Sequence, residues 1–321
     1  MDRNLALELV RVTEAAALSA ARWMGKGDGL QADAAAFEAM RKALESVNIR
    51  AGVCVGRPSL SGDDAFAEGR QIGADDAGNV QLDLALDPLE CVDSVATGRT
   101  NAMSVVAVNT DRTFLRGSSG LYMDKIAVGP EAAGKIDLGA SPLENLVNVA
   151  SAKRCYVEDL TVAILERERH ASLIRQVREA GARIHLISDG DLAASVATAI
   201  GDSGVDVLMG IGSALAAVLA GAALACVGGD MQCRLVPVLA GDEERIHKLT
   251  GGRANHKYGL PDLVGDGSVM FAATGITDGD VLRGVHFRKG GAATHSVVMR
   301  RRSGTIRFIH ANHFFERKPR Y

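Results

Sequence analysis

Residues 160–209 read LTVAILERERHASLIRQVREAGARIHLISDGDLAASVATAIGDSGVDVLM and give the clearest indication of the fold class. Three short apolar runs in it have the length and branched side chains of buried strands: residues 161–165, 183–187 and 205–209. Helical patterns separate them, one over residues 171–180 that stops at Gly181 and one that follows Asp191. Alternating strands and helices are typical of parallel βαβ units, so this stretch predicts an α/β fold.

Apolar spacing predicts further elements on both sides of this stretch. An opening helix is indicated by apolar residues at steps of three and four: Leu5, Leu9, Val12, Ala16, Ala20 and Trp23. A second helix carries Phe37, Met40 and Leu44 on its inner face and has Asp33 in or just before its first turn. A capping box at Ser141 and Glu144 begins another helix. Strands are predicted at residues 51–56, 80–86, 103–109, 269–273, 296–299 and 305–309.

Composition excludes several classes of protein. The chain has 321 residues, 47% of them hydrophobic and 23% charged, with a formal net charge of −3, so the whole chain has no electrostatic signature of a nucleic-acid-binding protein. Residues 207–229 carry no charge, but they are rich in Gly and Ala, and we expect a buried strand and helix there rather than a membrane span. Five widely spaced cysteines predict neither disulfides nor a zinc site, and Glu8 and Glu14 exclude a secretory leader, so we expect a cytoplasmic protein.

Basic residues gather in the last 22 positions: Arg300, Arg301, Arg302, Arg307, Arg317, Lys318 and Arg320. Because they alternate with strand residues, we interpret them as the exposed faces of an edge hairpin and a solvated tail, not as a nucleic-acid site.

Four short segments carry residues suited to chemistry, and each has a structural alternative. Asp87-Pro88-Leu89-Glu90 puts two carboxylates at a strand end, where they would either bind Mg²⁺ or Mn²⁺ or form a solvated turn. Asp189-Gly190-Asp191 precedes a helix and would form either a ligand site or a helix cap with a turn. Gly210-Ile211-Gly212-Ser213 would cradle an anion or serve close packing. Arg167 and Arg169 would clamp a phosphate or form a solvated charge cluster.

Together, these segments resemble a known family. The matching motifs run in order along nearly the whole chain: Arg11-Val12-Thr13-Glu14, Asp33, Asp87-Pro88-Leu89-Glu90, Tyr122-Met123 with Lys125, Val128-Gly129-Pro130, Asp189-Gly190-Asp191, Gly210-Ile211-Gly212 and Ala273-Thr274-Gly275-Ile276-Thr277. On these residues the chain is identified as a member of the class II fructose-1,6-bisphosphatases of bacteria, in the lithium-sensitive sugar phosphatase superfamily.

The resemblance implies a layered α/β/α/β/α fold with two domains. Residues 1–155 would form an N-terminal metal and phosphatase α+β domain, and residues 156–321 a C-terminal α/β domain that binds sugar phosphate. It also implies hydrolysis of the 1-phosphate of fructose 1,6-bisphosphate with Mn²⁺ or Mg²⁺, in gluconeogenesis and glycerol metabolism. The implied partners are a sugar bisphosphate and either further copies of the chain or an active homologue.

The family's functional residues carry over in part. Three of its five metal-binding and catalytic carboxylates correspond to Asp33, Asp87 and Glu90. The implied substrate contacts are Glu90, Cys91, Val92, Tyr122, Arg167, Arg169, Asp189, Asp191 and the backbone of Ser213. The other two metal-binding Glu residues correspond to Arg57 and Ala216, and acidic residues that help to activate water correspond to Ser59, Ser61 and Gly62.

These departures leave two functions open. Either Asp33, Asp87 and Glu90 still hold Mn²⁺ or Mg²⁺ for hydrolysis, or the chain is a catalytically impaired relative that binds a phosphosugar or pairs with an active homologue. The second is favoured, because a guanidinium repels a divalent ion and several losses fall on one site. Arg57 is then expected to take the vacated cation position and to pair with Asp87 or Glu90.

Overall fold

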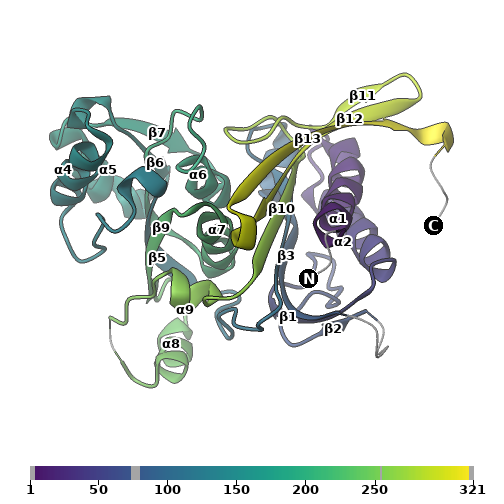
Figure 1. The fold of residues 1–321 in the computed structure, drawn as a ribbon, viewed down its shortest axis with the longest axis horizontal. Coiled ribbons are helices and arrows are strands. Elements are labelled where there is room, and N and C mark those ends of the chain that lie inside the picture. The colour runs from purple at the N-terminus through teal and green to yellow at the C-terminus, as the bar shows by residue number, and fades with distance from the viewer. Residues whose placement is uncertain (1–3, 74–79, 254, 318–321) are drawn as a thin grey trace. The chain divides into compact units, whose positions relative to one another are not determined.

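The computed structural model describes residues 4–73, 80–253 and 255–317. It divides into two compact units, residues 1–114 with 267–321 and residues 115–266 (Figure 1). The domain boundary expected between residues 155 and 156 therefore falls inside the second unit. The reason is long-range pairing, because β10 (Val269–Gly275) returns to the first sheet and pairs along the whole of β4 (Met103–Asn109).

The first unit is built on an eight-stranded mixed sheet in the order β11-β12-β10-β4-β3-β1-β2, with β13 paired to β12. Its remaining strands are β1 (Ile49–Val55), β2 (Gln71–Ile72), β3 (Val80–Glu90), β11 (His286–Arg288), β12 (Gly291–Arg300) and β13 (Thr305–Phe314). Only the β1–β3 pair is parallel. The helices α1 (Leu5–Ala20), α2 (Gly29–Glu45) and α3 (Val92–Thr97) belong to the same unit.

The opening helix packs as its apolar spacing predicts. Leu5, Leu9, Val12 and Ala16 of α1 are buried and form one hydrophobic core with residues of α2 and the sheet. Because alternate residues of a strand face the same side, Leu82, Leu84 and Leu86 of β3 meet the helices together.

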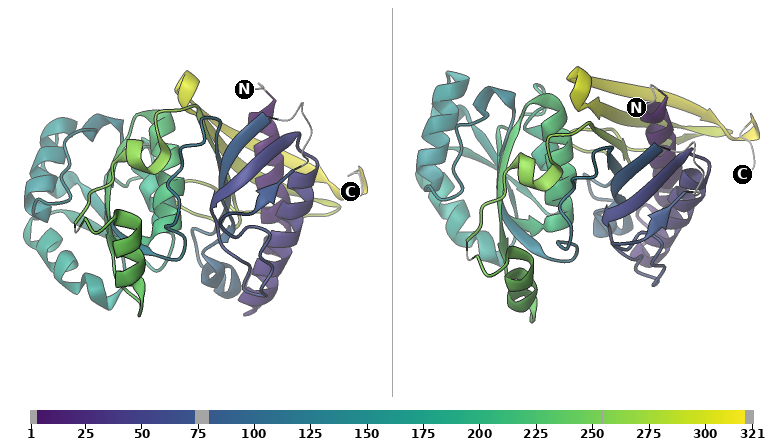
Figure 2. Two further views of the ribbon diagram at one scale, coloured as in Figure 1. Left: turned by 90° about the horizontal axis from the view of Figure 1, so that it is seen from below. Right: turned by 60° about the horizontal axis from the view of Figure 1, so that its bottom comes forward.

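The second unit is built on a five-stranded mixed sheet in the order β7-β6-β8-β5-β9. Figure 2 shows this unit, coloured from teal to green, from two further sides. Its strands are β5 (Tyr122–Val128), β6 (Thr161–Leu165), β7 (Arg183–Ile187), β8 (Val207–Ser213) and β9 (Asp230–Val236). Its helices are α4 (Pro142–Lys153), α5 (Ala171–Glu179), α6 (Asp191–Ala197), α7 (Ala214–Val227), α8 (Asp242–Thr250) and α9 (Leu260–Val264). The strand β6 lies parallel to both β7 and β8, which confirms the predicted βαβ units and the α/β class.

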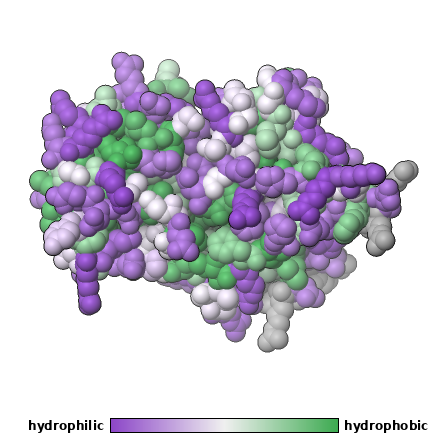
Figure 3. Space-filling model, turned by 90° about the horizontal axis from the view of Figure 1, so that it is seen from above, coloured by the Kyte–Doolittle hydropathy of each residue, from purple (hydrophilic) through white to green (hydrophobic). Residues whose placement is uncertain are grey.

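The uncharged stretch 207–229 forms β8 and the buried helix α7, as expected. No helix in the described part of the chain is long and apolar enough to cross a membrane. Hydrophilic and hydrophobic residues alternate over the face in Figure 3. The basic C-terminal segment forms the predicted edge hairpin of β12 and β13, whereas Lys318 and Arg320 lie outside the described residues.

Candidate functional site

The three carboxylates predicted to bind metal all lie in the first unit. Asp87 and Glu90 lie at the end of β3, and Asp33 lies in α2. The side chain of Asp28 caps α2 by accepting a hydrogen bond from the Gln31 N–H at 3.0 Å. The helix therefore begins earlier than expected, and Asp33 is fully buried in its second turn. The prediction that Asp33 belongs to the first turn is wrong.

Arg57, which follows β1, joins two of these carboxylates. Its Nη2 lies 2.7 Å from Oδ1 of Asp33 and 3.0 Å from Oδ1 of Asp87. The same nitrogen donates to the carbonyl oxygen of Leu89 at 3.0 Å. The expected pairing of Arg57 with Asp87 is thus confirmed, and Asp33 is a second partner.

The surroundings of Arg57 hold its side chain in place and keep it charged. Its guanidinium lies 5.2 Å from the centre of the Phe37 ring, within the range of a cation–π contact. The second oxygen of Asp33 accepts a hydrogen bond from the Leu60 N–H at 2.6 Å. Burial opposes the charge of Arg57, but Asp87 and Asp33 outweigh it and raise the pKa of Arg57 above its ordinary value.

The turn after β3 carries a side chain in a backbone conformation that favours glycine. The β3–β4 register shifts between Asp87 and Glu90, and Cys91 follows with a left-handed backbone, φ 66° and ψ 58°. A Cβ in this conformation costs roughly 1 kcal/mol relative to glycine. The Cys91 thiol donates to Oε2 of Glu90 at 2.7 Å, and Val92 begins α3.

In the second unit, the structure brings two predicted substrate contacts together. Arg169 follows β6, and its guanidinium lies 5.8 Å from the centre of the ring of Tyr122, the first residue of β5. Arg169 also donates to the carbonyl oxygen of Ile211 at 2.9 Å. Arg167 is exposed and donates to the neighbouring carbonyl oxygen of Glu166 at 3.0 Å. The edge of this unit therefore presents two guanidinium groups and a phenol ring.

Asp191 and Ser213 are joined by Lys125, whose role is not evident from the sequence. Lys125 of β5 is 1% exposed, forms an ion pair with Oδ2 of Asp191 and donates to the carbonyl oxygen of Ser213 at 3.0 Å. The sequence feature that could have revealed this role is a lysine within a strand of the core, because a buried charged side chain must have a partner. Asp189 is half-buried, and its carboxylate accepts from the Gly190 N–H at 3.0 Å.

Gly212 is required by this ion pair. A Cβ at this position would lie 1.9 Å from Oδ2 of Asp191 and 3.0 Å from Nζ of Lys125. We expect Gly212→Ala to destabilise the chain by about 1–3 kcal/mol, because the pair would have to move inside a packed region. Urea unfolding measures this. Gly201→Ala is the matched control, since its Cβ would meet no atom within 4 Å, and equal losses in the two variants would contradict the assignment.

His170, in its neutral form, joins the end of β6 to β8 next to Arg169. Its Nδ1 lies 2.7 Å from the carbonyl oxygen of Leu165, and its Nε2 accepts from the Ile211 N–H at 2.8 Å, so the proton is assigned to Nδ1. Burial, and next the nearby charge of Arg169, lowers the pKa of His170 below 6.5.

This lowered pKa predicts how stability depends on pH. As the pH falls, His170 takes up a proton in the unfolded chain at a higher pH than in the folded chain. The contribution of His170 to the free energy of unfolding is therefore complete above pH 6.5 and is lost as the pH falls toward the pKa of the folded state. The slope from one group is at most about 1.4 kcal/mol per pH unit. Urea unfolding between pH 7 and pH 5 measures it, and His170→Gln should have a flatter profile. Parallel profiles would show that His170 is not the group responsible.

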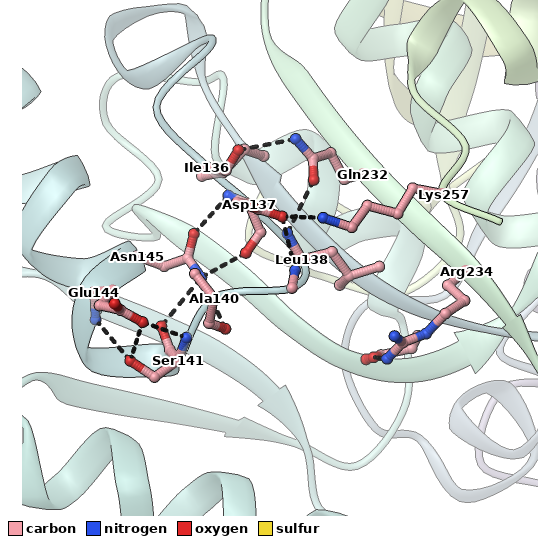
Figure 4. A network of polar contacts seen from close by, with 12 residues as sticks. Ile136, Asp137, Leu138, Ala140, Ser141, Glu144, Asn145, Gln232, Arg234 and Lys257 are labelled. Atoms are coloured by element: carbon pink, nitrogen blue, oxygen red, sulfur yellow. Dashed lines mark hydrogen bonds and ion pairs between the residues drawn. The ribbon is translucent and has the colours of Figure 1, made fainter. Parts of the chain in front are cut away.

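A separate polar network fixes the loop before α4 (Figure 4). Asn145 accepts from the Asp137 N–H at 2.8 Å and donates to the Asp137 carbonyl oxygen at 2.9 Å. Gln232 of β9 holds the backbone on either side of Asp137, and Lys257 forms an ion pair with its carboxylate. The capping box predicted at Ser141 is confirmed at the start of α4. These groups satisfy one another and hold the loop on β9.

Comparison with known proteins gives the family. The model of the family described as "Bacterial fructose-1,6-bisphosphatase, glpX-encoded" matches residues 3–313. The chain is 39% identical to "D-fructose 1,6-bisphosphatase class 2/sedoheptulose 1,7-bisphosphatase" of Synechococcus sp. (strain JA-3-3Ab), over 98% of this chain and 96% of that protein. It is 38% identical to "Fructose-1,6-bisphosphatase class 2" of Haemophilus influenzae, over 98% of both chains. The resemblance drawn from the motifs is thus confirmed, and the chain belongs to the bacterial class 2 fructose-1,6-bisphosphatase family.

Proposed function

We propose that this chain binds a phosphorylated sugar but does not hydrolyse it by the metal-dependent route that its family membership implies. The observation that carries the proposal is Nη2 of Arg57 at 2.7 Å from Asp33 and 3.0 Å from Asp87. Magnesium-like ions need anionic oxygens at about 2.1 Å with no competing cation. A guanidinium stays charged at any physiological pH, so Arg57 already pairs with two of the carboxylates that would hold the ion and offsets part of their charge. Asp33 and Asp87, paired as they are with Arg57, do not fit a divalent metal centre.

Further substitutions support the loss of metal-dependent turnover. Ala216, at a position where the family has a liganding Glu, is buried in α7 and offers no oxygen from its side chain. Ser59, Ser61 and Gly62 lack the acidic groups that would activate water. Cys91 places a side chain at a left-handed turn, where a glycine would let the backbone approach a phosphate more closely.

The binding half of the proposal rests on the second unit. Arg167 is exposed, and Arg169 is positioned by Tyr122 and Ile211, as suits two groups that hold a phosphate ester through charged hydrogen bonds. The proposed sugar contacts are Glu90, Cys91, Val92, Tyr122, Arg167, Arg169, Asp189, Asp191 and Ser213. Lys125 pairs with Oδ2 of Asp191, so Asp191 would contact the sugar through its other carboxylate oxygen.

An active phosphatase is the second candidate, because Asp33, Asp87 and Glu90 keep the family's residue types and the curated relatives are named as bisphosphatases. Here the three carboxylates would hold Mn²⁺ or Mg²⁺, and Arg57 would have to leave them.

Phosphate release decides between the two candidates. The purified chain is assayed with Mn²⁺ on fructose 1,6-bisphosphate and sedoheptulose 1,7-bisphosphate, beside the Haemophilus influenzae relative as the active control. We expect release from the relative and none from this chain. Metal-dependent release at the relative's rate would overturn the proposal.

Binding is measured separately by thermal shift with the same sugar bisphosphates without metal. A ligand at a hundredfold excess over its Kd should add about 2.7 kcal/mol of stability. Arg169→Ala should remove most of that shift, whereas Arg175→Ala, on the exposed surface of α5, should keep it. No shift in the parent chain would overturn the binding half and leave the result on turnover unaffected.

A further inference from the structure

The end of β8 next to β6 is completed by two side chains instead of a strand. Among the described residues, the pairing of β6 with β8 ends at Ala163 and Leu208, before β8 reaches Ile211. At Ile211, Nη2 of Arg169 donates to the carbonyl oxygen at 2.9 Å, and Nε2 of His170 accepts from the N–H at 2.8 Å. A strand residue directs both of these groups to one edge, so Arg169 and His170 take the place of β6 there.

The ring of His170 is held at both of its nitrogens. It is 2% exposed, and its Nδ1 lies 2.7 Å from the carbonyl oxygen of Leu165 at the end of β6. The proton on Nδ1 is donated to this oxygen, which leaves the lone pair of Nε2 for the Ile211 N–H. A Cβ on Gly210 would lie only 3.0 Å from Nε2, so the ring also packs closely against the backbone of β8. His170 therefore fixes the distance between the end of β6 and the Ile211 peptide.

The direction of the Arg169 side chain depends on the same peptide. Arg169 comes from the same turn as His170, but it is exposed, and its guanidinium lies 5.8 Å from the centre of the Tyr122 ring. A guanidinium has five N–H donors in a rigid plane, and the hydrogen bond to the carbonyl oxygen of Ile211 uses one of them. That bond sets the orientation of the plane and hence of the donors that could meet a phosphate group. A group that holds the Ile211 peptide in place therefore also directs Arg169.

We infer that His170 is a positioning residue for the binding of phosphate by Arg169, and that it acts through the peptide of Ile211. The inference rests on the proposed binding of a phosphorylated sugar by the second unit. His170 does not itself touch the ligand, because it is buried and both of its ring nitrogens have partners within the chain. Its loss should weaken binding by about the worth of one hydrogen bond, roughly three- to tenfold in Kd.

Two substitutions separate the two hydrogen bonds of the ring. In His170→Gln the side-chain oxygen can replace Nε2 and accept from the Ile211 N–H, whereas the shorter side chain of His170→Asn can replace only Nδ1 and its contact with Leu165. Binding of fructose 1,6-bisphosphate without metal is measured by isothermal titration calorimetry at neutral pH. We expect His170→Gln to keep a Kd close to that of the parent chain and His170→Asn to raise it roughly three- to tenfold. His247→Asn, on the exposed surface of α8, is the matched control and should keep the parent Kd.

A second change at Arg169 tests whether the effect passes through this residue. Arg169→Lys keeps the charge but not the planar fork of N–H groups, so its ammonium group would bind phosphate without the orientation that Ile211 gives to a guanidinium. Adding His170→Asn to Arg169→Lys should therefore raise the Kd by less than about twofold. If His170→Asn has its full effect in this background, His170 acts independently of Arg169, and the inference is overturned.

Hydrogen exchange of the parent chain gives a test that needs no variant. The ligand would bind the arrangement in which His170 holds Ile211, so we expect saturating fructose 1,6-bisphosphate to slow exchange of the Ile211 N–H more than that of the Val177 N–H in α5. Equal slowing at both amides, or an unchanged Kd in His170→Asn, would overturn the role of His170 and leave the proposed function standing. A parent chain that binds no sugar bisphosphate would overturn both together.

Discussion

Replacing Lys125 with methionine is expected to lower the free energy of unfolding by about 3–5 kcal/mol, because the substitution leaves the carboxylate of Asp191 buried without its counter-charge. Nζ of Lys125 also donates a hydrogen bond to the carbonyl oxygen of Ser213. The substitution therefore removes the group that joins the end of β8 to the start of α6. Urea unfolding followed by circular dichroism measures the loss. Methionine keeps the length of the side chain, so the effect reports mainly the charge.

Two further variants test the cause of this loss. Lys125→Met combined with Asp191→Leu removes both charges and should recover much of the stability, since apolar pairs often replace buried ion pairs at little cost. Lys248→Met breaks an exposed ion pair with Glu244 and should have little effect. If Lys125→Met were no more harmful than Lys248→Met, the buried pair would not hold this part of the second unit together.

Arg57→Met should have the second largest effect, a loss of about 3 kcal/mol at neutral pH. The fully buried carboxylate of Asp33 and that of Asp87 would face each other without a cation. A divalent ion could then supply the missing charge, so Mn²⁺ should raise the melting temperature of the variant. Mn²⁺ should leave the parent unchanged, because its guanidinium already occupies the position between the two carboxylates.

A surface arginine gives the control for this result. Arg41 pairs with Glu38 and Glu45 on the exposed side of α2, and Arg41→Met should leave both the melting temperature and its response to Mn²⁺ nearly unchanged. A parent chain that is stabilised by Mn²⁺ as strongly as Arg57→Met would contradict the view that Arg57 replaces the metal.

Local elements of this fold are predictable because their causes are local. The strands at residues 103–109, 161–165 and 183–187 match β4, β6 and β7, since short apolar runs between turn residues suffice to define them. The strand predicted at residues 205–209 begins two residues before β8 and ends four residues before it does, because Gly210 and Gly212 suggest a loop. In the structure β8 continues to Ser213 by pairing with β5, and both glycines make room for side chains that pack against them.

The site was predictable only where a residue type limits its partners. The family resemblance placed Arg57 among the metal-binding carboxylates, where a positive charge was expected to pair with Asp87 or Glu90, and the structure confirms the pairing with Asp87. The partner of Lys125 lies 66 positions away, so no local pattern connects it to Asp191. The domain division was missed for the same reason, because pairing of β10 with β4 depends on contacts between distant segments.

The discontinuity of the first unit affects the order in which the chain can fold during synthesis. Residues 115–266 contain every strand of the five-stranded sheet, so this unit can close as soon as it leaves the ribosome. The larger sheet must wait for residues 267–321, which bring β10, β12 and β13 to the side of β4. Until residues 267–321 have been made, that edge is open to other nascent chains, and a premature stop after residue 266 would leave it exposed permanently.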